Sequence, residues 1–315
     1  MLEVIEAGGL VTLQDMGRTG WRRFGVPASG PMDEFAHRGA NLLIGNAPAA
    51  ATLEIGAGDL MLRAGHDHVI AAGGAGYELT VNEWTFPLWG SYFVRSGWVI
   101  QLRKTAGGMW AYLAIAGGFE ATPVLGSRST YLRGRFGGVG GRPLSEGDVL
   151  RSVEAPRSMM ETAGRALRTE AVPSYGAIPT IDVIPVSQED NFAPGSVESL
   201  FASTFRVSGA SDRMGYRLEG PLLACRGSAE LISEGIAPGA IQVPPDGAPI
   251  VLMADSATAG GYPNIGCVVR ADMPLLAQRR PGKDEVRFRP ASVEEAQEKY
   301  RRMLQRLTTA IVEAE

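Results

Sequence analysis

Short runs of alternating or β-branched apolar residues dominate the chain. An apolar residue at every second position gives a strand one face for a core and one for water. The runs that predict strands are Val4 to Thr12, Thr52 to Arg63, Val69 to Ala72, Tyr92 to Lys104, Met109 to Ile115, Val183 to Pro185, Ser203 to Val207, Glu230 to Ser233, Ala240 to Val243 and Pro249 to Ala254. Because turn residues bound these runs, the pattern is typical of a barrel or a sandwich, and we expect a mainly β protein.

A first helix is expected from Asp33 to Ile44. It follows Ser29-Gly30-Pro31, and a proline in the first turn is tolerated because its missing N–H would have no helical partner there. Gly45 ends the apolar pattern. We expect this helix to flank a barrel.

A stronger helix is expected near the end of the sequence. Ser292 and Glu295 form a capping box worth about 1 kcal/mol, and the helix would run to about Val312. Its apolar residues recur at i, i+3 and i+4 and form one stripe: Ala296, Tyr300, Met303, Leu304, Leu307 and Ile311. Such a stripe predicts packing on a core or a contact between subunits rather than chemistry.

The length predicts roughly two domains, at about 150 residues per domain. The sequence changes character between Glu154 and Ala177, where Pro173-Ser174-Tyr175-Gly176 breaks a stretch rich in Arg, Ala, Ser and Met. The boundary is therefore placed between residues 1–172 and 173–315. A short internal repeat favours two similar halves, since Asp, Met, Gly and Arg occur in that order in Gln14 to Arg18 and in Ser211 to Arg217.

Composition narrows the function classes. The 41 glycines and 20 prolines predict many turns, and 20% charged against 45% apolar residues indicates a compact globule. A net charge of −4 offers no field for a polyanion, so a general nucleic-acid binder is disfavoured. Two cysteines are too few for a disulfide framework, and no membrane span or export signal is expected. We expect a cytoplasmic protein.

The densest candidate for chemistry is the segment Ser127 to Gly138. If it is extended, Tyr131, Arg133 and Arg135 share one face, and two neighbouring guanidiniums favour a carboxylate or phosphate held bidentately. The alternative is a solvated strand face with local acidic partners. The glycines that follow are not a P-loop, because Gly-x-x-x-x-Gly-Lys is absent.

A second candidate region is Ser211 to Gly220. Alternation puts Met214, Tyr216 and Leu218 on one face and Arg213, Arg217 and Glu219 on the other. The polar face is either a surface ladder of Arg–Glu pairs or the wall of a polar pocket.

Two further polar residues lie beside apolar runs. Gln242 sits between apolar neighbours, and a buried amide must find partners or face a cavity. Asp255 follows the run Ile250 to Met253 and precedes Thr258 and a glycine loop. A carboxylate in that position is either a site group or a turn-forming residue.

Histidine chemistry has little support. His66-Asp67-His68 places two imidazoles on one side of an extended chain, but no third ligand is identifiable, so a surface strand or turn is favoured over a metal site. A Ser-His-Asp triad is disfavoured because Gly-x-Ser-x-Gly is missing and there are only three histidines.

Motifs along the whole chain carry a family resemblance. They are Thr12 to Arg18, Gly25 to Asp33, Ala40-Asn41, Gly45-Asn46, Ser127 to Gly138, Ser211 to Pro221, Ser233 to Gly235, Gln242 to Gly247, Ala277-Gln278 and Pro281-Gly282. In this order they resemble the biotin-dependent carboxyltransferase family, which contains the C subunit of 5-oxoprolinase, allophanate hydrolase subunit 2 and the antagonist of the Kip kinase inhibitor. The resemblance implies a cyclophilin-like β-barrel architecture, here two barrel-like subdomains with short flanking helices and a C-terminal helix.

The chain departs from the family pattern at one loop. Members usually carry Asp-Arg-Gln-Thr-Thr-Gly-Gly where this chain has Asp255-Ser256-Ala257-Thr258-Ala259-Gly260-Gly261, so activity is changed or lost if the replaced groups touch substrate. The three lysines, Lys104, Lys283 and Lys299, do not form the Met-Lys-Met site that carries biotin. Biotin, if used, arrives on another protein.

The resemblance implies a subunit of an ATP-dependent 5-oxoprolinase that opens 5-oxoproline to glutamate. Its expected partners are a protein like the B subunit of that enzyme, similar to the Kip inhibitor and allophanate hydrolase subunit 1, and a lactam-utilisation protein like its A subunit. ATP is used by the complex. The expected site comprises Arg128, Arg133, Arg135 and Arg213 as anion contacts, Asp255 and Glu234 as acid/base or metal-orienting groups, Tyr131, Tyr216 and Gln242 as positioning groups, and Thr258 as a substrate contact. No resident metal is expected.

Two other functions stay open. One is a carboxyltransferase acting on urea or another small amide, with biotin carried by a separate protein. The other is a regulatory protein that binds a kinase inhibitor, which the altered loop from Asp255 to Gly261 favours.

Overall fold

The computed structural model describes residues 1–153, 155, 157–186, 189–227 and 231–313, and it divides the chain into two compact units. Unit 1 comprises Met1–Arg18, Ser29–Tyr175 and Leu304–Glu315, and unit 2 comprises Thr19–Ala28 and Gly176–Met303. The chain passes from one unit to the other after Arg18, Ala28, Tyr175 and Met303. Tyr175 stays in unit 1, where its hydroxyl donates to Asp33 Oδ2 over 2.9 Å.

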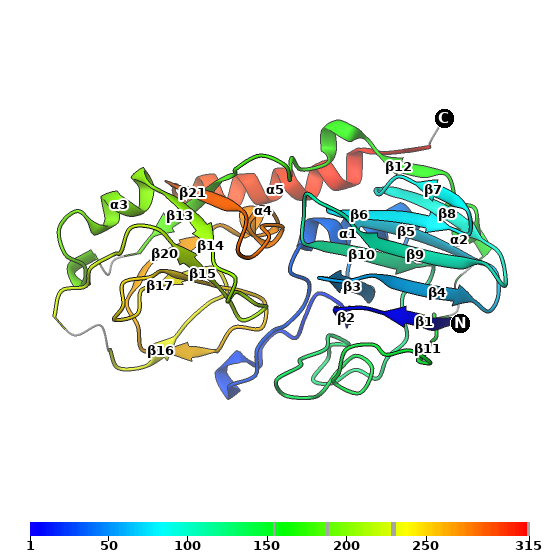
Figure 1. Cartoon of the computed structure of the whole chain (residues 1–315), viewed down its shortest axis with the longest axis horizontal. Coiled ribbons are helices and arrows are strands. Elements are labelled where there is room, and N and C mark those ends of the chain that lie inside the picture. The colour runs from blue at the N-terminus through cyan, green and yellow to red at the C-terminus, as the bar shows by residue number, and fades with distance from the viewer. Residues whose placement is uncertain (154, 156, 187–188, 228–230, 314–315) are drawn as a thin grey trace. The chain divides into compact units, whose positions relative to one another are not determined.

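Unit 1 is built from two sheets (Figure 1). The first has the order β11 (Val149–Leu150), β1 (Leu2–Ala7), β4 (Leu60–Ala64), β9 (Val99–Lys104), β6 (Tyr77–Val81) and β7 (Trp84–Phe86). The second has the order β2 (Leu10–Gln14), β3 (Thr52–Gly56), β10 (Trp110–Ile115), β5 (His68–Gly74), β8 (Gly90–Val94), β12 (Arg165–Leu167) and β22 (Ile311–Glu313). Apolar side chains from both sheets, such as Leu62 and Leu113, form one core.

Strands β5 and β10 are buried along their whole length. The reason is that α1 (Glu34–Leu43) packs on both of them. Asp33 caps α1 by accepting a hydrogen bond from the backbone N–H of Ala36 at 2.9 Å. The prediction that Pro31 lies in the first turn of this helix is wrong, because Pro31 precedes the N-cap residue Asp33. An aspartate at the cap position is the stronger start signal, because its carboxylate satisfies an unpaired helical N–H.

Unit 2 is a closed seven-stranded barrel (Figure 1). Its order is β13 (Thr180–Pro185), β20 (Asn264–Val268), β17 (Ala240–Gln242), β18 (Ile250–Leu252), β15 (Gly215–Glu219), β14 (Thr204–Val207) and β21 (Glu285–Pro290). Strands β13 and β21 close it as a parallel pair. A separate two-stranded sheet joins β16 (Glu234–Gly235) to β19 (Ala259–Gly260). The expected mainly β fold is therefore confirmed, with a closed barrel in unit 2.

The last long helix, α5 (Val293–Thr309), begins as predicted. The capping box is formed in both directions: Glu295 N–H donates to Ser292 Oγ over 3.1 Å, and Ser292 N–H donates to a Glu295 carboxylate oxygen over 2.8 Å. The helix ends earlier than expected, because the chain pairs as β22 with β12. The shorter helices are α2 (Arg157–Met160), α3 (Ser196–Ala202) and α4 (Met273–Ala277), with 3₁₀ turns at Arg22–Phe24, Thr169–Ala171, Glu189–Asn191 and Arg270–Asp272. Among the described residues no helix is long and apolar enough to span a membrane.

Three of the expected strands were drawn too long. Val4 to Thr12, Thr52 to Arg63 and Tyr92 to Lys104 each divide into two strands around a turn. Of the strand expected from Glu230 to Ser233, Glu230 lies outside the described residues, and 231–233 form no strand. Each connection contains a glycine turn signal, at Gly8-Gly9, Gly58 and Gly97, so reading only the apolar pattern on both sides joined two strands into one.

Candidate functional site

The segment Ser127 to Gly138 is a series of turns, so the extended strand expected there is wrong. Tyr131 and Phe136 pair with each other through their backbones, and Arg135 has a positive φ of 54°. The reversal between them leaves Arg133 and Arg135 exposed. The shared guanidinium face therefore does not form, because a period of two holds only for extended backbone.

The buried carboxylate of Asp15 holds this segment in place. Asp15 Oδ1 accepts from the hydroxyls of Ser127 and Ser129 at 2.5 and 2.7 Å, and Oδ2 accepts from Arg128 N–H at 2.6 Å. A further bond comes from Gly17 N–H at 2.9 Å. Burial opposes ionisation of Asp15, but these hydrogen bonds lower its pKa below the ordinary value. Asp15 is thus an ionised anchor whose oxygens are already occupied.

Arg18 supports the same segment from inside unit 1. Its side chain is 1% exposed and donates to the backbone carbonyls of Ser129 and Val124. Its guanidinium also lies over the Phe136 ring at 4.9 Å. The sequence analysis did not predict this structural role of Arg18, although the internal repeat from Gln14 to Arg18 includes it.

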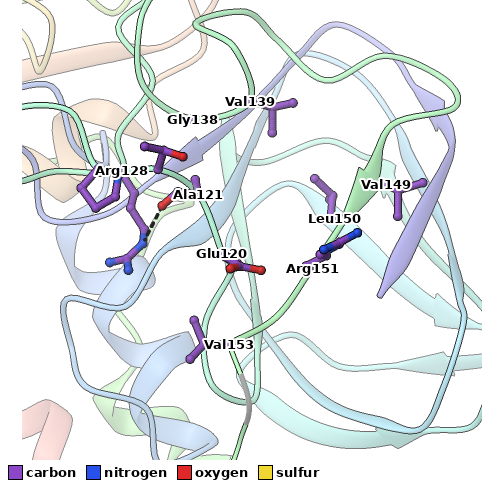
Figure 2. A pocket seen from close by; sticks show the side chains of 11 residues that line it. Glu120, Ala121, Arg128, Gly138, Val139, Val149, Leu150, Arg151 and Val153 are labelled. Carbon is purple, nitrogen blue, oxygen red and sulfur yellow. Dashed lines mark hydrogen bonds between the residues drawn. The ribbon is translucent and has the colours of Figure 1, made fainter.

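Arg128 lines a pocket that lies wholly within unit 1 (Figure 2). The pocket has a volume of about 780 Å³, and Arg128 is fixed at its wall by a hydrogen bond from Nε to the Ala121 carbonyl at 3.1 Å. Of the ten expected site residues, Arg128 is the one in this pocket.

In unit 2, Arg213 and Asp255 form a buried, bidentate ion pair. Arg213 Nε donates to Asp255 Oδ2 over 2.8 Å, and Nη2 donates to Oδ1 over 3.1 Å. The two side chains are only 4% and 6% exposed. The expected outward position of Arg213 is wrong, because β15 begins at Gly215 and Arg213 precedes the alternation. Each group neutralises the other.

Tyr216 belongs to the barrel core. It is 1% exposed, and its hydroxyl donates to the Ala277 carbonyl over 2.8 Å. The alternation predicted for β15 is confirmed for Tyr216 and Leu218, which are buried, and for Arg217 and Glu219, which are exposed.

The loop after Asp255 brings three other expected residues together. Glu234 pairs with Gly260 across the β16–β19 sheet, and Thr258 accepts a bond at its carbonyl from Ile236 N–H over 3.1 Å. A side chain at Gly260 would collide with the Gln242 amide, since an added Cβ would lie 2.6 Å from Nε2. Glu234, Thr258 and Gln242 therefore lie around one loop. We call these three residues the unit 2 cluster.

Arg22 joins this loop, although sequence reasoning did not select it. Its guanidinium Nη2 donates to the carbonyls of Ile236 at 2.5 Å and Ala257 at 2.9 Å. Burial lowers its pKa. Arg22 lies outside the motifs and more than 200 positions from both partners, so no local pattern predicts the contact.

The described residues contain no group of three or more His, Cys, Asp or Glu side chains that would hold a metal ion. The rings of His66 and His68 lie 4.3 Å apart, at the turn that leads into β5. Burial raises the pKa of both cysteine thiols, Cys225 and Cys267, which keeps them protonated and poorly nucleophilic.

Fold and sequence together define the class. Residues 24–290 match the family model described as carboxyltransferase domain, subdomain A and B, so the chain belongs to this family, as its motifs predict. It is 39% identical to the 5-oxoprolinase C subunit of Escherichia coli (strain K12), over 94% of this chain and 93% of that protein. Its identity with the 5-oxoprolinase C subunit of Haemophilus influenzae is 36%, again over 94% and 93%. The crystal structure of the K. lactis urea amidolyase superposes with a TM-score of 0.90 at 30% identity, over 97% of this chain but 20% of that one.

Proposed function

We propose that this chain is a subunit of an ATP-dependent 5-oxoprolinase, a hydrolase that opens 5-oxoproline to glutamate in the cytoplasm. The observation that carries the proposal is the match, over 94% of this chain, to two proteins named as the C subunit of 5-oxoprolinase. The chain acts together with a B-type and an A-type partner, the other two subunits of such an enzyme, and it is active only in that complex.

ATP is assigned to one of the partners. This assignment is supported by the glycine-rich stretch in unit 1, where two N–H groups are already used within the chain: Gly138 N–H donates to Arg128 O, and Gly141 N–H donates to Gly137 O. A nest that binds phosphate needs backbone N–H groups directed at the ligand.

The acid/base role falls to Glu234 in the unit 2 cluster. Asp255, the other candidate, is committed to a buried ion pair with Arg213. Glu234 lies on the exposed short strand β16, where a carboxylate is accessible for proton transfer to the leaving amide nitrogen. Gln242 and Thr258 flank it and are assigned to substrate contacts.

The proposal is tested by mixing the purified chain with its B-type and A-type partners and measuring glutamate formed from 5-oxoproline. We expect ATP-dependent glutamate only in the complete mixture. Glu234→Gln should lower kcat about 10²-fold or more, the usual contribution of an acid/base group. Glu219→Gln is the matched control, because Glu219 is an exposed barrel carboxylate paired with Arg206. No ATP-dependent glutamate in the complete mixture would refute the proposal.

A second function is supported by the superposition on urea amidolyase. We propose as the alternative a carboxyltransferase component that takes a carboxyl group from carboxybiotin on another protein. In this alternative biotin is carried by the other protein. Two of the three lysines already have partners: Lys104 donates to the carbonyls of Gly108 and Met109, and Lys299 pairs with Asp182 and Asp272. Saturable binding of biotin or a biotinylated carrier, measured by calorimetry, favours this alternative, and its absence at millimolar biotin counts against it.

A further inference from the structure

The pocket in unit 1 has the composition of a small-molecule site. Its volume of about 780 Å³ lies in the usual range for ligand pockets, and it is open to solvent, since Glu120, Val149, Arg151 and Val153 are exposed. Much of the wall is apolar, including Val139, Val149, Leu150 and Val153. Three charged side chains interrupt it: Glu120, Arg128 and Arg151 (Figure 2). All eleven lining residues belong to unit 1, so the pocket is complete without the unit 2 cluster.

Arg128 is fixed on three sides and keeps its outer nitrogens available. Its N–H donates to Asp15 Oδ2 at 2.6 Å, its carbonyl accepts from Gly138 N–H at 2.8 Å, and its Nε donates to the Ala121 carbonyl at 3.1 Å. Within the described part of the chain, neither Nη atom has a hydrogen-bond partner or a carboxylate within ion-pair distance. The two Nη groups form a preorganised fork that matches a carboxylate.

Arg151 and Glu120 add one charge of each sign. The backbone N–H of Glu120 donates to the Arg151 carbonyl at 2.8 Å, which places the two residues next to each other. Neither side chain is in an ion pair within the described ranges. The pocket therefore carries two guanidiniums and one carboxylate. This balance favours an anion that also bears an N–H donor, since Glu120 accepts the N–H and repels a second acid.

We propose that this pocket binds a small carboxylic acid that carries a nearby N–H group, with the carboxylate on Arg128 and the N–H on Glu120, which lies between Arg128 and Arg151 in Figure 2. Lactam acids and amino acids share this chemistry. Only the choice of 5-oxoproline and glutamate as probes rests on the proposed function.

Calorimetric titration of the full chain tests the proposal. We expect saturable binding of 5-oxoproline or glutamate that weakens in variants of the pocket, which distinguishes this pocket from the substrate contacts assigned to the unit 2 cluster. Cyclopentanecarboxylate, which lacks the N–H, and 2-pyrrolidinone, which lacks the carboxylate, should each bind about 10-fold more weakly or worse, the effect of one lost charge-assisted contact. Tighter binding of inorganic phosphate than of either acid would overturn the proposal.

Variants locate the binding. Arg128→Lys and Arg128→Ala should each weaken binding of the acids about 10-fold, and Glu120→Gln should weaken binding of the N–H acids but leave cyclopentanecarboxylate unchanged. Arg95→Lys, an exposed arginine outside the pocket, is the control. Unchanged melting temperatures show that the variants are folded. Wild-type affinity in both arginine variants, or a wild-type Kd above about 10 mM for both acids, would overturn the proposal.

The result is separable from that for the proposed function. If the chain binds the acids but the complete mixture forms no glutamate, the proposed function fails and the pocket stands. If the mixture turns over and the pocket variants change neither binding nor KM, the pocket assignment fails alone.

Discussion

Arg213 and Arg128 were both expected to contact an anion, but their surroundings differ. Arg213 is 4% exposed and saturated by Asp255, whereas Arg128 is half-buried and has unused Nη groups in a pocket. An arginine whose fork is filled by the protein holds the fold, and one that is fixed only through Nε and its backbone is poised for a ligand. The difference lies in whether a carboxylate of the chain reaches the fork.

The largest expected effect is on the Arg213 side of this comparison. Arg213→Ala leaves Asp255 buried without a partner, and breaking a buried pair in this way costs about 3 to 5 kcal/mol. Urea unfolding followed by circular dichroism measures this loss. Arg217→Ala, an exposed arginine on β15, should change little. A stable Arg213→Ala protein that has lost activity would make Arg213 a ligand contact and break the comparison.

Lowering the pH should destabilise unit 1, which contains Arg128, because all three histidines lie in this unit. Burial lowers the pKa of His37 from 6.5 to about 4. Between these two pKa values, the unfolded chain therefore binds a proton at His37 that the folded chain does not bind. The resulting stability is fully present above about pH 6.5 and is lost as the pH falls toward 4, by about 3 kcal/mol. Burial likewise lowers the pKa of His68 to about 4. Urea unfolding across this range measures the slope of stability against pH, which His37→Gln should reduce without abolishing it. Equal slopes in wild type and His37→Gln would contradict the assignment.

Removing the charge of Asp15 should loosen the support of Arg128. Asp15→Asn weakens four hydrogen bonds to one carboxylate, and we expect a loss of roughly 1.5 to 3 kcal/mol together with weaker acid binding in the pocket. Asp212→Asn is the matched control, since the exposed Asp212 makes the equivalent bond to the N–H two residues on. The melting temperature and the binding calorimetry measure both effects. Unchanged acid binding in Asp15→Asn would show that Asp15 does not position Arg128 for the ligand.

The smallest effect is expected at Arg133 and Arg135. Both are exposed on the turn between Tyr131 and Phe136, away from the pocket lining. Replacing either by Ala should leave the melting temperature, acid binding and glutamate formation of the complex unchanged. A loss of activity of about 10-fold in either variant would return them to the site.

Local signals in the sequence predicted much of the fold. The capping box of Ser292 and Glu295 and the alternation of β15 depend on neighbours within a few positions, and both are present. The class of protein followed from motifs spread over the chain. The turn at Tyr131 was not predictable from alternation, because positive-φ residues reverse the chain there.

The candidate site was harder to predict, since distant partners decide its chemistry. Asp15 bonds to residues more than 110 positions away, Arg213 to one 42 positions away, and Arg22 to one 235 positions away. Residue type and spacing select charged candidates, but they do not show which charge is already neutralised by the fold.

The most direct test of the contrast between the two arginines is a spectrum of arginine Nε–H groups in the ¹⁵N-labelled chain. Signals are assigned by their loss in Arg128→Lys and Arg213→Lys. On addition of 5-oxoproline or glutamate, the Arg128 signal should shift progressively to saturation while the Arg213 signal stays in place. An unmoved Arg128 signal beside a shifting Arg213 signal would contradict the account.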